Sequence, residues 1–218
     1  MARAAIQPVS PAPRGSGRPL SLVYSGGGPF PPHRRPAVEN GILAMAVFLG
    51  TEAMLFAGLI SAFLILRASA PSWPPADQPR LPVAVTGFNT MVLLVSAYTM
   101  QRAAAESRRR RRTAAVRWLA VTAALGASFL LVQGVEWVQL IQHGLRASSS
   151  PYGGTFYTLI GCHGVHVLAA VVTLVVLLAR FGRTRRIERW QTPIAVCRLY
   201  WLFVVAVWPF LYALVYLA

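Results

Sequence analysis

The sequence contains no lysine and few charged residues of any kind. Charged side chains make up 12% of the 218 residues, and all 21 basic residues are arginine. A soluble globular domain carries about 25% charged residues, so this composition, with a mean hydropathy of +0.53, excludes an ordinary soluble domain. The formal charge of +15 would suit a nucleic-acid-binding protein, but the arginines lie between long apolar runs. They are interpreted as charges that flank membrane segments, and no nucleic-acid partner is expected.

Cysteine is also scarce. Cys162 and Cys197 fall in different apolar segments. The topology predicted below places them near opposite membrane faces, about 20 Å apart in depth, whereas a disulfide needs Cα atoms within about 7 Å. Two free, buried thiols are therefore expected. The sequence also lacks a nucleophile elbow, a phosphate-binding loop and a CxxC motif, so no motif indicates hydrolytic, nucleotide-binding or dithiol chemistry.

The first 40 residues lack any apolar periodicity. They hold eight prolines and five glycines, a composition that predicts a disordered tail over 1–40. The compact apolar stretch of a secretory signal peptide is missing. The segment contains arginines but no acidic residue before Glu39, so a transit peptide is an alternative. Such a peptide forms an amphipathic helix, and the high proline content argues against one.

Long apolar runs are what the rest of the chain does contain. Each has at least 19 residues, and the five cover 41–66, 83–101, 115–141, 155–179 and 194–217. A helix of about 20 apolar residues crosses the hydrocarbon core, and backbone inside lipid must satisfy its own hydrogen bonds. The expected fold is all-α, a polytopic membrane protein in which 41–218 form a bundle of five transmembrane helices.

Arginine counts predict the orientation of these helices. The second connection holds the run from Arg108 to Arg112 and the fourth holds five arginines, whereas the first and third hold two and one. Positive charge is concentrated on the cytoplasmic side of a membrane protein. The amino terminus is therefore expected in the cytoplasm and the carboxyl terminus in the periplasm of a bacterial inner membrane.

Two of the six acidic residues, Glu52 and Glu136, fall inside apolar segments, whereas the others, including Glu106, are assigned to the tail or loops. Glu52 lies about 16 Å along the first helix, close to the bilayer midplane. An intramembrane carboxylate marks a functional site or a partner contact by default. The alternative is a protonated glutamate that is hydrogen-bonded to a neighbouring helix, and both interpretations stay open.

Glu136 and two histidines are expected to meet in one buried polar cluster. Glu136 lies near the outer end of the third segment, and His163 and His166 lie two to three turns into the fourth segment from the same side. His163 and His166 share a helix face, so a metal site with Glu136 as third ligand is one alternative. His143 with His163 is the only pair that could ligate a haem from opposite sides. The favoured interpretation is a hydrogen-bond network between helices, with no metal or cofactor on this chain.

Small residues spaced four apart predict two faces for helix packing. These rows are Ala53, Ala57 and Ser61 in the first segment, and Thr122 and Gly126 in the third.

Several segments resemble the cytochrome c oxidase subunit III family. Residues 48–58 read FLGTEAMLFAG, similar to the first helix that the family shares, and 152–167 read YGGTFYTLIGCHGVHV, which contains the complete glycine-x-histidine-glycine-x-histidine pattern of the family. The short stretches 73–75 (WPP), 89–90 (NT) and 133–137 (QGVEW) are also similar. The resemblance extends over 41–218 and fits the short, five-helix bacterial form.

The last helix departs from the family pattern. Its aromatic frame of Tyr200, Trp201 and Trp208 is present, but Leu202 and Ala206 lie in the stretch where the family has a histidine and an aspartate. Both polar residues are replaced by apolar ones. This departure leaves a divergent branch open, including the subunit III-like protein associated with nitric oxide reductases.

The resemblance implies a non-catalytic subunit of a proton-pumping haem-copper terminal oxidase. Such a subunit stabilises the catalytic subunit and sustains proton uptake. It binds phospholipid in a cleft between helix bundles, and its partners are oxidase subunits I and II, with subunit IV. Haem and copper are expected on those partners. A small proton or ion channel is the alternative from another class, but no helix here carries the row of polar residues that would line a pore.

Overall fold

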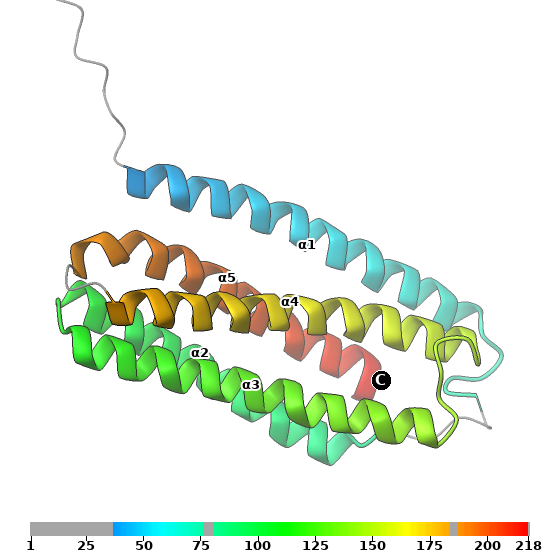
Figure 1. Ribbon diagram of the computed structural model, residues 1–218. Coiled ribbons are helices and arrows are strands. Elements are labelled where there is room, and N and C mark those ends of the chain that lie inside the picture. Colours follow the sequence, from blue (N-terminus) through cyan, green and yellow to red (C-terminus); the bar gives the residue numbers. More distant parts are fainter. Residues whose placement is uncertain (1–36, 76–80, 184–186, 218) are drawn as a thin grey trace, which may run out of the picture. The chain divides into compact units, whose positions relative to one another are not determined.

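The chain is helical in the part that the structure describes. The structure is a computed structural model that describes residues 37–75, 81–183 and 187–217, and Figure 1 shows its elements in chain order. The long helices are α1 (Ala37–Ser69), α2 (Val83–Arg108), α3 (Arg112–Gln142), α4 (Pro151–Arg183) and α5 (Gln191–Tyr212). A short 3-10 helix, η1 (Ile187–Trp190), precedes α5, and a π-helix, η2 (Ala213–Leu217), follows it.

The five long helices confirm the predicted fold class, because each is long and apolar enough to cross a membrane. They extend past the apolar runs: α3 begins at Arg112 and α4 at Pro151. Backbone groups still need partners beyond the hydrocarbon boundary, so a helix continues where the apolar pattern has ended. For the same reason α1 begins at Ala37, inside the segment predicted as a tail. Residues 1–36 of that predicted disordered tail lie outside the described residues.

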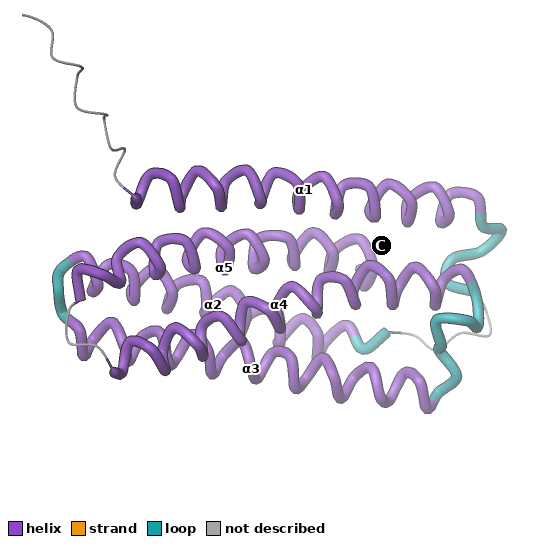
Figure 2. The backbone as a smooth tube through the Cα atoms, turned by 45° about the horizontal axis from the view of Figure 1, so that its top comes forward, coloured by secondary structure: helices purple, strands orange, loops and turns teal. Residues whose placement is uncertain are grey.

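Four of the helices form a bundle, and the fifth lies against its outside. Within the bundle, α2 packs on α3 and α5, and α4 packs on the same two helices; α1 packs on α5 and α4. Figure 2 shows α1 running along the bundle as an outer helix. In its most apolar stretch only 6% of α1 is buried, against 33 to 39% for the other helices. Much of the apolar surface of α1 is therefore open to lipid or to a partner.

One of the two small-residue rows packs inside the bundle. Gly126 of α3 lies against the ring of Trp201, with which a Cβ atom at this position would overlap. Thr122, one turn earlier, shares a 2.8 Å hydrogen bond with Thr99 of α2. The row on α1 is exposed, and its members are Ala53, Ala57 and Ser61.

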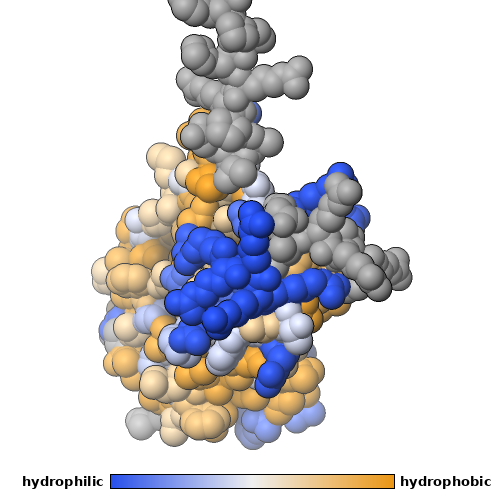
Figure 3. Space-filling view, turned by 90° about the vertical axis from the view of Figure 1, so that its left-hand side faces the viewer, coloured by the Kyte–Doolittle hydropathy of each residue, from blue (hydrophilic) through white to orange (hydrophobic). Residues whose placement is uncertain are grey.

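The turn between α2 and α3 gathers positive charge around a buried carboxylate. The sequence pattern predicts that Glu106 lies in a loop, but this prediction is wrong: α2 extends to Arg108 and the side chain of Glu106 is buried. The guanidinium groups of Arg109 and Arg111 lie 3.3 and 3.7 Å from its carboxylate oxygens. They stabilise the charge, and the helix can therefore include it. Seen from this end of the bundle, hydrophilic residues gather in one patch (Figure 3).

Candidate functional site

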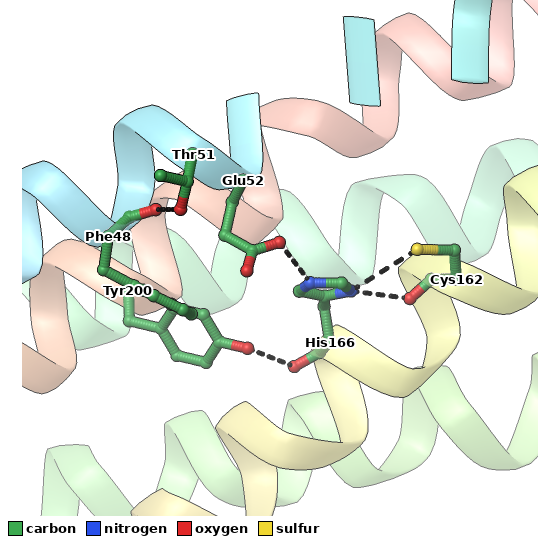
Figure 4. Close-up of polar contacts among 6 residues, drawn as sticks. All are labelled: Phe48, Thr51, Glu52, Cys162, His166 and Tyr200. Carbon is green, nitrogen blue, oxygen red and sulfur yellow. Dashed lines mark hydrogen bonds and ion pairs between the residues drawn. The ribbon is translucent and has the colours of Figure 1, made fainter. Parts of the chain in front are cut away.

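Glu52 of α1 and His166 of α4 form a hydrogen bond within the membrane-spanning part of the chain. His166 Nε2 lies 2.7 Å from Glu52 Oε2, and the side chains are 14% and 15% exposed respectively. Figure 4 shows the two side chains pointing toward one another, with the Tyr200 hydroxyl donating to the backbone carbonyl of His166 at 3.4 Å. The ring of Phe56 packs on the imidazole with a centroid distance of 5.2 Å. Glu52 is thus hydrogen-bonded to a neighbouring helix of its own chain.

The hydrogen bonds of His166 define where its protons lie. Nδ1 lies 2.7 Å from the carbonyl oxygen of Cys162, and a carbonyl only accepts, so Nδ1 carries a proton. One further proton lies between Nε2 and Glu52. It sits either on the carboxyl group, which then donates to a neutral imidazole, or on the imidazole, which then donates to a carboxylate. The pair as a whole is neutral in both arrangements, which reduces the cost of its burial.

The thiol of Cys162 lies beside this pair without being activated by it. Its Sγ atom is 3.9 Å from His166 Nδ1, and with Glu52 beyond the ring the order of groups is that of a nucleophile, a base and an orienting acid. The proton on Nδ1 is donated to the Cys162 carbonyl, however, so this nitrogen offers no lone pair to the thiol. Cys162 and Cys197 are both free, as predicted, although Cys162 is only half-buried.

Glu136 belongs to a second polar cluster, on the other side of the bundle from α1. Both of its carboxylate oxygens lie 3.0 Å from the Thr86 hydroxyl of α2, and Gln133 Nε2 donates to one of them at 2.9 Å. Gln133 Nε2 also lies 3.2 Å from the hydroxyl of Tyr216 in η2. The cluster joins three elements of the bundle, and Glu136 is 3% exposed.

His163 is in neither cluster, so the prediction that Glu136, His163 and His166 meet is wrong. Its ring is 1% exposed and stacks on Trp208 with a centroid distance of 4.9 Å, while Phe129 packs on it edge to face. Three residues along a helix leave two side chains about 60° apart. That angle is sufficient to direct His163 into the centre of the bundle and His166 toward α1.

The histidines do not form the ligand sets considered from the sequence. In residues 37–75, 81–183 and 187–217, no three His, Cys, Asp or Glu side chains gather as a metal site would require. His143 is exposed at the end of α3, with Nδ1 2.6 Å from the Gln139 carbonyl oxygen. His163 is enclosed by aromatic rings. These two residues do not fit the opposed axial ligands of a haem.

The aromatic frame of α5 fastens this helix to α2. Trp201 Nε1 donates to the Ser96 hydroxyl at 3.1 Å, and Trp208 Nε1 donates to the Thr90 hydroxyl at 2.8 Å. Both indoles are fully buried, so each hydrogen bond satisfies a group that would otherwise be costly inside the bundle. Leu202 is half-buried and Ala206 is exposed, and the frame is formed without the polar pair of the family pattern.

A cavity of about 770 Å³ lies where α1, α4, η1 and α5 meet. Its two arginines are at the arginine-rich end of the bundle, and the rest of its lining consists mainly of apolar side chains from α1, α4 and α5. Six of the lining residues are Arg180, Arg189, Trp190, Met45, Phe48 and Leu177. Arg180 and Arg189 are part of the arginine pattern that predicts the orientation of the helices.

Comparisons with known proteins identify the family. Residues 25–218 match the family model described as cytochrome c oxidase subunit III. Cytochrome c oxidase subunit 3 of Synechocystis is 32% identical over 199 residues, which cover 91% of this chain and 83% of the relative. The Bacillus sp. protein of the same name is 32% identical over 192 residues, 87% of this chain and 92% of the relative. The protein of the same name from Corynebacterium diphtheriae is 34% identical over 174 residues, which cover 78% of this chain and 84% of the relative. The family model matches all five helices, and the alignments cover most of the length of these relatives. The chain therefore belongs to the cytochrome c oxidase subunit III family.

Proposed function

We propose that this chain is the non-catalytic subunit III of a proton-pumping haem-copper terminal oxidase in aerobic respiration. It stabilises the catalytic subunit and sustains proton uptake. One observation carries the proposal beyond family membership. The hydrogen bond between Glu52 and His166 joins residues 48–58 to residues 152–167, the two segments that resemble the family most closely. Glu52, one of the two intramembrane carboxylates, thus holds α1 to the bundle.

The redox centres belong, in this proposal, to the partner subunits. The partners are oxidase subunits I and II, with subunit IV. The polar groups of this chain support a structural role because they bond to one another: His166 to Glu52, and Glu136 to Thr86 and Gln133. The exposed apolar side of α1 supplies surface for partner helices, and its small-residue row permits a close helix approach.

The 770 Å³ cavity suits a phospholipid. Arg180 and Arg189 offer guanidinium groups for a headgroup phosphate, and Trp190 beside them suits the membrane interface. Met45 and Phe48 continue the wall with apolar side chains on which an acyl chain can pack. The opening between α1 and the bundle would then be filled by lipid, and the lipid would support the position of α1.

The membrane in this proposal is the bacterial inner membrane, with the amino terminus in the cytoplasm. The arginine-rich turn between α2 and α3, together with η1 and the adjacent end of α4, lies at one end of the bundle (Figure 1). Positive charge at that end supports its cytoplasmic placement.

The proposal is tested by purifying the complex through a tag on this chain. Subunits I and II should co-purify, the complex should show haem absorption, and it should reduce oxygen. Co-purification with nitric oxide reductase subunits, and reduction of nitric oxide without oxygen reduction, would contradict the proposal. The three relatives described above are named as oxidase subunits, and these names support neither the nitric oxide reductase alternative nor an ion channel.

A further inference from the structure

Two arginines lie inside the helices rather than in the turn that joins them. Arg102 is six residues before the end of α2 at Arg108, and Arg117 is five residues after the start of α3 at Arg112. At 1.5 Å per residue they lie about 9 and about 8 Å from the helix ends. Both side chains are exposed. A guanidinium group at this depth extends toward the interface and requires an anionic or hydrated partner there.

No carboxylate in the described part of the chain pairs with either arginine. The contact of Arg102 is with the face of Trp118, 5.6 Å from the ring centroid. The nearby Glu106 is bound by Arg109 and Arg111 instead. A guanidinium that stacks on an aromatic ring keeps its N–H groups at the edge of its plane, where they can bind an anion.

Beside these arginines the surface of α3 is hollowed. A hollow of about 210 Å³ is lined by Ala114, Arg117, Trp118 and Val121. Tyr98 of α2 packs edge to face on Trp118 with a centroid distance of 6.5 Å. Tryptophan and tyrosine are the residues typical of the membrane interface, and Val121 continues the hollow one turn deeper. Ala114 and the cationic Arg117 line the hollow toward the start of α3, and Trp118 and Val121 line it toward the membrane interior. The hollow therefore has a charged part and an apolar part, as an amphiphile requires.

We propose that this hollow binds an anionic phospholipid. The headgroup phosphate lies against Arg117, Arg102 supplies the second positive charge above the Trp118 ring, and an acyl chain runs along Val121. The site is separate from the 770 Å³ cavity, which is lined by α1, α4, η1 and α5. Inorganic phosphate shares the charge chemistry but gains nothing from the apolar half of the hollow, so the lipid is the ligand that fits both halves.

The test is native mass spectrometry of the tagged, detergent-purified complex during titration with phosphatidylglycerol. In the double variant Arg102→Gln/Arg117→Gln, the phosphatidylglycerol concentration at which half of the complexes hold this lipid should be higher than in the wild type. We expect an increase of about fivefold for each arginine removed and about 25-fold for both. The control Arg108→Gln/Arg146→Gln removes the same charge from exposed positions elsewhere and should bind as the wild type does. Val121→Trp, which fills the hollow and keeps both arginines, should lose the same lipid.

Three outcomes would overturn the proposal. The first is equal lipid binding by the double variant and its charge-matched control. The second is displacement of that lipid by an equal concentration of inorganic phosphate, because a free anion would then suffice. The third is loss of a partner subunit from the double variant with an unchanged lipid count, which would assign the arginines to a carboxylate of that subunit.

Discussion

Replacing Glu52 by alanine should loosen α1 from the bundle. Hydrogen bonds between membrane helices average about 0.6 kcal/mol, with a maximum near 1.7. The truncation also leaves His166 Nε2 without its partner at 2.7 Å, which adds the cost of an unsatisfied buried group, about 1–3 kcal/mol. We therefore expect a loss of about 1–3 kcal/mol. The loss of stability should be confined to α1, because little of this helix is buried against the rest of the bundle.

Glu52→Gln should largely retain the attachment. The amide keeps the volume of the carboxyl group, and its NH₂ group can donate to a neutral imidazole at Nε2, as a protonated glutamate does. Replacing His166 by leucine in the wild type and in the Glu52→Ala variant completes a double-mutant cycle. If the two side chains act through each other, the cycle gives a coupling energy of about 1 kcal/mol.

The assay is hydrogen exchange of the α1 backbone in the purified complex, together with the midpoint of its thermal unfolding. Ser61→Ala is the matched control, because the Ser61 hydroxyl bonds to the carbonyl of Ala57 in its own helix at 2.8 Å. Additive effects of the Glu52 and His166 substitutions, or a Glu52→Gln variant as loose as Glu52→Ala, would refute the reasoning. Loss of oxygen reduction in a fully assembled Glu52→Gln complex would show instead that this carboxylate takes part in proton transfer.

Two further predictions concern packing and orientation. Gly126→Ala should lower the unfolding midpoint by an amount equivalent to about 1–3 kcal/mol, because its Cβ would overlap Trp201; Gly134→Ala, with open space around its Cβ position, should leave the midpoint unchanged. In a cysteine-free background, a single cysteine in place of the exposed Arg108 should react with an impermeant maleimide only after cell lysis, and one in place of the exposed Ser148 should react in intact cells. The reverse labelling pattern would reverse the proposed topology.

The fold was predictable because each membrane helix must satisfy its own backbone and display about 20 apolar residues. Those requirements act locally, so runs of apolar residues are sufficient to find the five helices. The residues at which the helices begin and end were less predictable. Glu106 reads as a loop residue in the sequence, and only the placement of Arg109 and Arg111 around it explains why the helix continues through a buried carboxylate.

The candidate site was only partly predictable for a related reason. The cost of a carboxylate in lipid singles out Glu52 and Glu136 from the sequence alone. Which group satisfies each one depends on how the helices are rotated against one another. Helix rotation directs His166 to Glu52, and His163 into a ring of aromatic side chains. Spacing along one helix cannot supply that information, because it describes neighbours on the helix and not the helix opposite.

The arrangement of polar and apolar groups fits the proposed role of a subunit whose redox centres lie on its partners. The Glu52–His166 pair and the Glu136 cluster bond inward and hold the helices to one another. The surfaces left open are of two kinds: the apolar outer side of α1, and arginines beside hollows at one end of the bundle. The first kind can bind only other helices or acyl chains, and the second can bind anionic headgroups. In the proposed function, such a subunit would influence the oxidase through the helices and lipids held at these surfaces.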